Sequence, residues 1–227
     1  MVNPNTSVAA LVAEHPSCAP ILQRYRIDFC CHGEGSLTAA ALGAGVPVGT
    51  LVSELEARIS ETCGLVTGPK LSMLTTEQLV AHIVRTHHAY LREALPYLTT
   101  LADKVGRVHG DRNSNLVVLA DVVSKLSTAL LEHLDEEEET LFPALCSPDV
   151  DRAWATQQLS EMRTEHESIA AQLDAIHSAT EEFAIPDWAC VSYRQLFGTL
   201  REVEADILIH VHTENYELTS RFTGAQV

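Results

Sequence analysis

The sequence contains few aromatic residues and few positive charges. Phe, Trp and Tyr make up only 5% of its 227 residues, while hydrophobic residues as a whole make up 46%. Because Leu, Ala and Val dominate that share, the composition favours helices over β-sheets. Lys and Arg number 15 against 31 Asp and Glu, which gives a formal net charge of −16. Nucleic acids and anionic membrane surfaces repel so acidic a chain, so neither is expected as a partner.

Long apolar runs and a recognisable targeting segment are also missing. No run approaches the roughly 20 apolar residues that a membrane-spanning helix needs. The first residues, MVNPNTS, lack the basic and apolar regions of a secretory signal. We therefore expect a cytoplasmic protein whose six cysteines are mostly reduced thiols and do not form a disulfide framework.

Glycine and proline are concentrated in a few places, and these divide the chain. The segment GLVTGPK at 64–70 predicts a boundary between a small helical domain, 1–66, and a larger domain, 71–227. Short helices are expected in the small domain near 7–14, 17–26, 36–43 and 48–62, with Ser36 as an N-cap. Four long helices are expected in the large domain near 75–106, 114–146, 151–181 and 187–221. Their short connections predict an all-α fold with an up-down-up-down four-helix bundle.

The apolar seams of the long helices, followed in alternating steps of three and four residues, are interrupted by polar side chains. In the second and fourth seams a His is followed four residues later by a Glu, in HLDEE at 133–137 and HVHTE at 210–214. The apolar part of the second seam is Leu116, Leu119, Val123, Leu126 and Leu130, and that of the fourth is Tyr193, Leu196, Leu200, Val203 and Ile207. The polar seam residues are His88, His133, Glu137, His166, His210 and Glu214.

A single His on such a seam is more often a hydrogen-bonded core residue than a metal ligand, and the acidic run DEEEE at 135–139 is mostly a solvated face. Six polar groups on four seams are harder to explain in this way. Burying them without partners costs several kcal/mol, and a bound metal ion is one way to offset that cost. His82, His87 and His212 fall off the seams. His109 lies roughly 30 Å beyond His88 along a helix and is left out of the predicted site.

Four imidazoles and two carboxylates are too many ligands for one tetrahedral zinc ion. They suit two ions that prefer octahedral coordination, share bridging carboxylates and keep open positions for a small ligand. Iron is the natural choice for this set of nitrogen and oxygen donors. We predict that Glu137 and Glu214 bridge the two irons and that the four His are terminal ligands, about two for each ion. The sequence does not assign individual His to either iron.

The seam residues also carry a resemblance to a known family. The two His-Glu pairs, the first of them followed by TLFP, resemble those of a hemerythrin-type di-iron bundle. The stretch RIDFCCHGEGSL at 26–37 is similar to the small domain of the iron–sulfur cluster repair di-iron proteins (the RIC family), as are THHAYLREALP at 86–96, RVHG at 107–110 and EH at 165–166. The likeness covers nearly the whole chain. One departure is NYELTSRF after Glu214, which lacks the Phe-Pro of the first copy, and another is His32, where a Gly is expected.

This resemblance implies two non-haem irons that are bridged by carboxylates and by an oxo or hydroxo group. It implies a protein that repairs iron–sulfur clusters damaged by nitrosative or oxidative stress, through nitric oxide binding and reduction, iron donation, or both. Nitric oxide reductase activity would make the protein an enzyme. The implied partners are nitric oxide or dioxygen, iron–sulfur client proteins, an electron donor and, as one candidate assembly, a second copy in a homodimer. A hemerythrin-type dioxygen carrier or sensor is the alternative function, and a plain bundle with core histidines is a third.

Cys30 and Cys31 match the paired cysteines of that family and are the candidate catalytic residues. Adjacent cysteines chelate one ion less comfortably than a CxxC pair, and a disulfide between them is strained. Arg26 and His32 would favour a reactive thiolate if either lies close to the thiols. The alternative is that the two cysteines simply pack as small residues in a loop. Ordinary packing is expected for Cys18, Cys63, Cys146 and Cys190.

Overall fold

The computed structural model describes residues 1–63 and 70–224, which fold almost entirely into helices. Within these ranges there is no β-strand, only an isolated antiparallel bridge between Ser7 and Ser36. The predicted all-α fold is confirmed. All six cysteines fall in the described ranges, and none of them forms a disulfide. Apart from Lys70, the predicted boundary at 64–70 lies outside the described residues.

Contacts divide the chain into two compact units, which are described separately. The first unit combines Met1–Ala81 with Asp151–Ser160 and Leu208–Val227. The second unit combines His82–Val150 with Glu161–Ile207. Residues of the third and of the fourth long helix are divided between the two units, at Ser160 and at Ile207 respectively.

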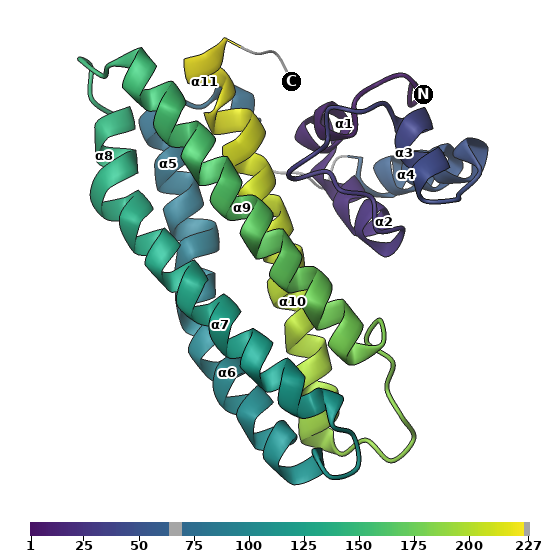
Figure 1. Cartoon of the computed structure of the whole chain (residues 1–227). Coiled ribbons are helices and arrows are strands. Elements are labelled where there is room, and N and C mark those ends of the chain that lie inside the picture. Colours follow the sequence, from purple (N-terminus) through teal and green to yellow (C-terminus); the bar gives the residue numbers. More distant parts are fainter. Residues whose placement is uncertain (64–69, 225–227) are drawn as a thin grey trace. The chain divides into compact units, whose positions relative to one another are not determined.

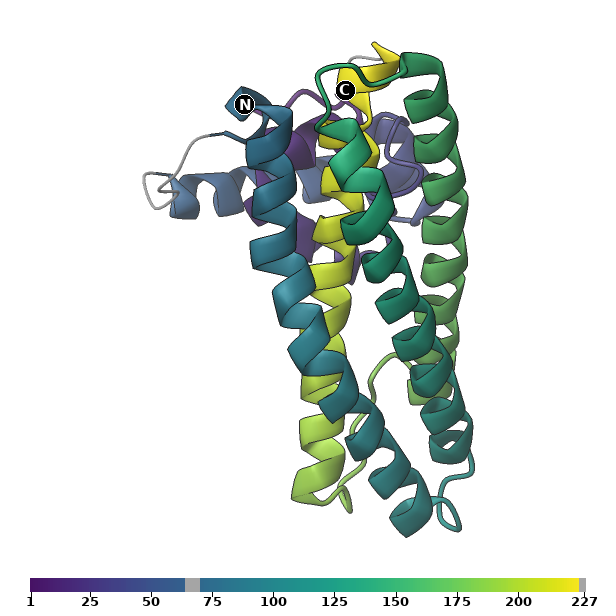
Figure 2. The ribbon, with the colours of Figure 1, turned by 90° about the vertical axis from the view of Figure 1, so that its left-hand side faces the viewer.

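The second unit is a four-helix bundle, in which α6 and α7 lie side by side in both views (Figure 1; Figure 2). Three of the long helices are runs of helical segments without an intervening loop, and the other is a single α-helix. The first long helix is α5 (Thr76–Ile83), the π-helical η3 (Val84–His88) and α6 (Ala89–His109). The second is α7 (Asn115–Glu136), the π-helical η4 (Glu137–Leu141) and α8 (Phe142–Leu145). The third is α9 (Arg152–Thr180), and the fourth is α10 (Val191–His212), the π-helical η5 (Thr213–Leu218) and α11 (Ser220–Thr223).

The predicted apolar seams form the core. Every residue of the second seam from Leu116 to Glu137 is buried, and so is every residue of the fourth from Tyr193 to Glu214. Burying each Leu or Ile side chain stabilises the fold by about 1.5–3 kcal/mol. This apolar part of each seam holds the helices together and sets which face the polar seam residues occupy.

Three of the four long helices contain a π-helical segment, and each segment contains a predicted ligand. His88 ends η3, Glu137 begins η4 and Glu214 lies in η5. A π-turn accommodates one extra residue and shifts the side chains that follow it, and such turns are common at functional sites. The regular spacing assumed for the sequence did not predict these segments.

The connection from α9 to α10 differs from the prediction. The fourth long helix begins at Val191, four residues later than expected. The three residues that follow α9, Glu181, Glu182 and Phe183, all have positive φ. Each left-handed residue costs roughly 1–2 kcal/mol. His177 compensates by bonding Glu182 Oε2 at 2.7 Å and Glu204 Oε1 at 2.6 Å through its two ring nitrogens.

The first unit contains the short helices close to their predicted positions. They are α1 (Val8–Glu14), the 3₁₀ helix η1 (Pro16–Cys18), α2 (Ala19–Arg24), α3 (Leu37–Gly43) and α4 (Val48–Thr62). The 3₁₀ helix η2 (Leu71–Met73) was not predicted. Ser36 is an N-cap, as predicted, and its Oγ accepts a hydrogen bond from the Ala39 N–H. The loop between α2 and α3 carries Cys30 and Cys31.

None of the helices in the described ranges could cross a membrane by itself. Only α3 and α4 taken together, with a bend of 118° between them, reach the required length and apolar composition. The cytoplasmic location stays a prediction.

Candidate metal centre

Glu137 is the central polar residue of the second unit. Its side chain is 2% exposed, at the start of the π-helical segment η4. Its Oε1 lies 3.4 Å from His133 Nε2, and its Oε2 lies 3.4 Å from His88 Nε2. The two oxygens of one carboxylate therefore face two different imidazoles.

His133 and His166 form a close pair beside this carboxylate. Their Nε2 atoms are 3.1 Å apart, and both side chains are buried. The ligand atoms of His133, Glu137 and His166 all lie within 4.8 Å of one another. Two nitrogens that bind one ion at right angles at about 2.1 Å lie about 3.0 Å apart. The two imidazoles thus already have the spacing of neighbouring ligands on a single ion.

The far nitrogens of two of these imidazoles are held by carboxylates. His88 Nδ1 is 2.9 Å from Glu138 Oε1, and His133 Nδ1 is 2.7 Å from Glu165 Oε2. Each Nδ1–H donates a hydrogen bond to its carboxylate, which leaves the Nε2 lone pair available for a metal ion and makes that nitrogen a stronger metal ligand. Glu138 and Glu165 therefore orient ligands without belonging to the predicted set.

Glu138 is itself anchored by Arg92, whose guanidinium donates to Glu138 Oε1 at 3.0 Å. Partial burial opposes ionisation of Glu138. The hydrogen bonds from His88 and Arg92 outweigh that effect and keep the pKa of the carboxyl below its usual value. The Glu138 carboxylate is therefore ionised when it accepts the hydrogen bond from His88 Nδ1.

In the first unit, His210 and Glu214 lie one helical turn apart on α10 and η5. Both side chains are fully buried, and His210 Nε2 is 2.8 Å from Glu214 Oε1. A buried carboxylate beside an imidazole nitrogen is again a pair of possible ligands for one ion.

The cysteine loop, residues 28–33, is also in the first unit and is organised by Asp28. Asp28 Oδ1 accepts hydrogen bonds from the backbone N–H groups of Cys30 and Cys31, at 3.0 and 2.9 Å. Asp28 Oδ2 is 2.9 Å from His32 Nδ1. Both cysteines are buried, and their Sγ atoms are 3.5 Å apart.

This arrangement does not favour a thiolate at Cys30. The hydrogen bond with Cys31, burial and the neighbouring negative charges of Cys31 and Asp28 all raise the pKa of Cys30 well above its ordinary value. The His32 ring faces the Asp28 carboxylate, with Nδ1 at 2.9 Å from Oδ2.

The cysteine loop rests on the helical segment that carries Glu214. Asn215 Nδ2 donates to Cys30 O at 2.8 Å, and the Gly33 N–H donates to Tyr216 Oη at 2.7 Å. His212 Nδ1 donates to Phe29 O at 2.9 Å. Burial lowers the pKa of His212 to about 4, although the bond to Phe29 opposes this shift, so His212 is neutral near pH 7.

Two family models match the chain. Residues 79–222 match the hemerythrin HHE cation-binding domain, and residues 4–58 match ScdA_N, a domain of unknown function. The iron–sulfur cluster repair protein YtfE of Yersinia pseudotuberculosis serotype O:1b (strain IP 31758) is 31% identical over 224 residues, or 96% of each chain. YtfE of Yersinia pestis (strain Pestoides F) is 30% identical over the same length and shares.

The chain belongs to the hemerythrin-like iron–sulfur cluster repair family. The predicted resemblance is confirmed by both matches, and the HHE match spans all six polar seam residues. The donors around Glu137 are imidazole nitrogens and carboxylate oxygens, which are the donors that non-haem iron takes in such bundles. This buried His and Glu cluster therefore fits the iron that is implied by the hemerythrin-like family.

The histidines that were left out of the prediction have other partners. His109 lies in α6, three residues beyond the predicted end of that helix, and its Nε2 is 3.2 Å from Cys190 Sγ. His87 is buried and bonds Asp206 Oδ1 at 2.9 Å. The sequence analysis missed Glu138 and Glu165, although Glu165 immediately precedes His166 in the EH dipeptide that carried part of the resemblance.

We expect Glu165→Gln to weaken iron binding about 10-fold. The amide still accepts a hydrogen bond from His133 but lacks the charge that strengthens the imidazole as a donor. Anaerobic competition with an iron chelator measures the change. Glu161→Gln, at an exposed position on the same helix, is the matched control. An equal loss in both variants would mean that only the net charge matters.

Proposed function

We propose that this protein repairs iron–sulfur clusters damaged by nitrosative or oxidative stress, with a two-iron centre in its hemerythrin-like bundle. The proposal is supported by the relatives, which are named as iron–sulfur cluster repair proteins and match 96% of the chain. The observation that carries the two-iron assignment is the Glu137 carboxylate, because its two oxygens face different imidazoles at equal distances of 3.4 Å. A carboxylate placed in this way can bridge two ions.

The two irons take different ligands in this proposal. One ion is held by His133 and His166 and the other by His88 and His210, with Glu137 and Glu214 shared between them. The spacing of the His133 and His166 nitrogens supports the first pair, and the second pair follows because only two imidazoles remain. We further propose that the domains are 1–66 and 71–227, since the two family models match 4–58 and 79–222.

Bound iron would supply the nitric oxide binding and electron transfer, or the iron to be donated. The chain supplies the conditions for this chemistry. The apolar seams exclude bulk water, while Glu138 and Glu165 keep protons on the Nδ1 atoms of His88 and His133. These contacts orient the two imidazoles with their Nε2 atoms toward Glu137.

Cys30 and Cys31 are proposed to connect this centre with a reductant or with the client protein. Support comes from η5, in which Asn215 follows the proposed ligand Glu214 and donates a hydrogen bond to Cys30 O. A movement of the η5 backbone would therefore displace both the cysteine loop and the proposed ligand Glu214. Iron–sulfur client proteins and an electron donor are the partners that this function requires.

A dioxygen carrier or sensor would use the same six ligands. The match of residues 4–58 to ScdA_N favours repair, because a carrier has no need of that domain and the relatives named for repair are matched along 96% of their length. Reversible optical changes on adding and removing dioxygen would support the carrier, whereas rapid irreversible oxidation supports repair.

The decisive experiment exposes the reduced, iron-loaded protein to nitric oxide without dioxygen. We expect nitrous oxide, released iron, or both, in amounts that increase with the protein concentration. Gas chromatography measures the first product and a colorimetric chelator the second. Protein with Glu137→Ala, tested in parallel, controls for reactions of loosely bound iron. The absence of both products would refute the proposal.

A further inference from the structure

Asp28, Cys30 and Cys31 form a cluster of three potential metal ligands that shares no residue with the histidine and glutamate set. Their ligand atoms, two sulfurs and a carboxylate oxygen, lie within 4.8 Å of one another. Both thiols are buried, at 3% and 1% exposure. The proposed function uses the thiols as a link and assigns no ion to them.

The distance between the two sulfurs suits a single ion. Two sulfurs bound to one tetrahedral ion at about 2.3 Å lie about 3.8 Å apart. Cys30 Sγ and Cys31 Sγ are already 3.5 Å apart without forming a disulfide. In an extended chain, adjacent side chains point to opposite faces, and two neighbouring thiols could not reach one ion.

The turn built on Asp28 is what brings the thiols together. One of its oxygens accepts both backbone N–H groups of the cysteines, so the chain curls around the carboxylate. Cys30 Sγ is 3.4 Å from that same oxygen. This turn overrides the expectation from sequence that adjacent cysteines chelate one ion poorly.

The cluster brings together the Asp28 carboxyl group and two thiols, and burial opposes the ionisation of these groups. Burial opposes ionisation of Asp28, yet hydrogen bonds from Cys31, His32 and Cys30 hold the pKa of its carboxyl below the usual value. The carboxylate is therefore charged beside two buried thiols. A cation would offset that charge and would replace the thiol protons.

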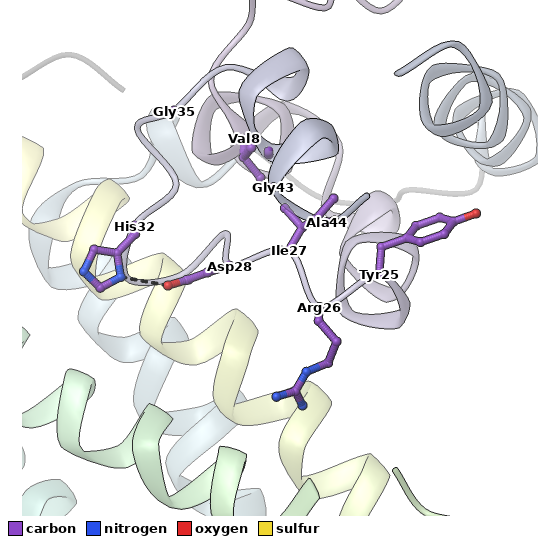
Figure 3. Close-up of a pocket in the computed structure, with 10 residues that line it drawn as sticks. Val8, Tyr25, Arg26, Ile27, Asp28, His32, Gly35, Gly43 and Ala44 are labelled. Atoms are coloured by element: carbon purple, nitrogen blue, oxygen red, sulfur yellow. Dashed lines mark hydrogen bonds and ion pairs between the residues drawn. The ribbon is translucent and has the colours of Figure 1, made fainter. Parts of the chain in front are cut away.

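A cavity lies next to the Asp28 side of the cluster. This cavity of about 520 Å³ in the first unit is lined by Asp28, His32, Arg26 and Tyr25 together with small and apolar residues. Figure 3 shows the His32 ring turned toward the Asp28 carboxylate at the edge of this cavity. Asp28 thus belongs both to the cavity wall and to the cluster.

We propose that Asp28, Cys30 and Cys31 bind one thiophilic divalent cation, of the class of Fe²⁺ or Zn²⁺. The ion bonds to both sulfurs and to a carboxylate oxygen, and the two thiol protons pass to solvent without any transfer of electrons. Three protein ligands leave the fourth tetrahedral position open, as in an exchangeable site and unlike a closed structural one. This site goes beyond the proposed function and does not depend on it.

Cobalt is the probe, because Co²⁺ takes tetrahedral thiolate sites and absorbs light there. The full-length protein, with iron already loaded in the bundle, is titrated with Co²⁺ in the absence of dioxygen. We expect thiolate-to-cobalt absorption in the near ultraviolet that saturates at about one Co²⁺ per chain, with release of protons. Zn²⁺ should abolish the absorption by displacing cobalt.

Three variants define the site. Cys30→Ser and Cys31→Ser should each remove most of the absorption, and Asp28→Asn, which keeps an oxygen acceptor for the turn, should weaken binding about 10-fold. Cys63→Ser and Cys190→Ser, at exposed thiols, are matched controls and should change nothing. X-ray absorption of the cobalt-loaded unmodified protein should show two sulfurs at about 2.3 Å, a result that does not depend on any variant folding.

The proposal is overturned if the unmodified protein shows no such absorption, if X-ray absorption finds no sulfur, or if both Cys30→Ser and Cys31→Ser leave the signal intact. Iron is measured in the same samples. Protein that binds cobalt through sulfur but never retains iron would support this site while refuting the proposed two-iron centre. The two proposals can therefore fail separately.

Discussion

A variant with both Glu137→Ala and Glu214→Ala is expected to lose nearly all of the iron in its bundle. Changing only an outer hydrogen-bond partner of a ligand weakens metal binding about 10- to 100-fold, so removal of both proposed bridging ligands should exceed about 100-fold. Four buried imidazoles would remain, with no carboxylate to balance the charge of two ions. Iron content after anaerobic loading and desalting, measured by atomic emission, tests this expectation.

The matched control for this variant is Glu136→Ala with Glu139→Ala. These two residues belong to the same acidic run, but their side chains are exposed. The control changes the net charge by the same amount and should keep its iron. Retention of both irons by the Glu137 and Glu214 variant would contradict the two-iron proposal directly.

A variant with Cys30→Ser and Cys31→Ser is expected to keep the iron of its bundle and to lose at least about 10-fold in repair rate. Serine is close to cysteine in size and preserves the backbone bonds of this loop to Asp28 and Asn215. Serine cannot supply a thiolate that reacts with a reductant, binds an ion or contacts a client protein. Recovery of activity by an iron–sulfur enzyme that nitric oxide has damaged measures the repair rate.

The control for the thiol variant is Cys63→Ser with Cys190→Ser, which removes two exposed thiols. Thermal unfolding followed by circular dichroism shows whether either double variant has lost its fold. Repair at the unmodified rate by a folded Cys30 and Cys31 variant would exclude the pair from the mechanism, and an equal loss in the control would mean that any thiol suffices.

The sequence alone was enough for the helices and for the face that each buries. Leu116, Leu130 and Ile207 fall on regular seams because an α-helix places residues three and four apart on one side. Such spacing is a local property, and it also marked His133 and Glu137 as buried before any contact was known. In the first unit, the start of α3 could also be predicted from the sequence, because the N-cap Ser36 is a local feature.

The outer partners of the ligands could not be predicted in this way. Glu138 bonds His88 across 50 positions of the chain, and Glu165 bonds His133 across 32. Each looks like any other solvated carboxylate in its own helix. Only the packing of one helix against another distinguishes them from Glu136 or Glu139, which point to solvent in the same acidic run.

The sequence by itself determined the all-α fold, the buried stripe of each long helix and the residue types that interrupt the stripes, because helical periodicity needs no partner. Tertiary structure decided how those residues can act. It placed the two oxygens of Glu137 before different imidazoles, inserted π-turns at His88, Glu137 and Glu214, and brought two adjacent thiols to one side of a turn. Each of these arrangements depends on how parts of the chain that are distant in sequence pack against one another, which helical periodicity alone does not specify.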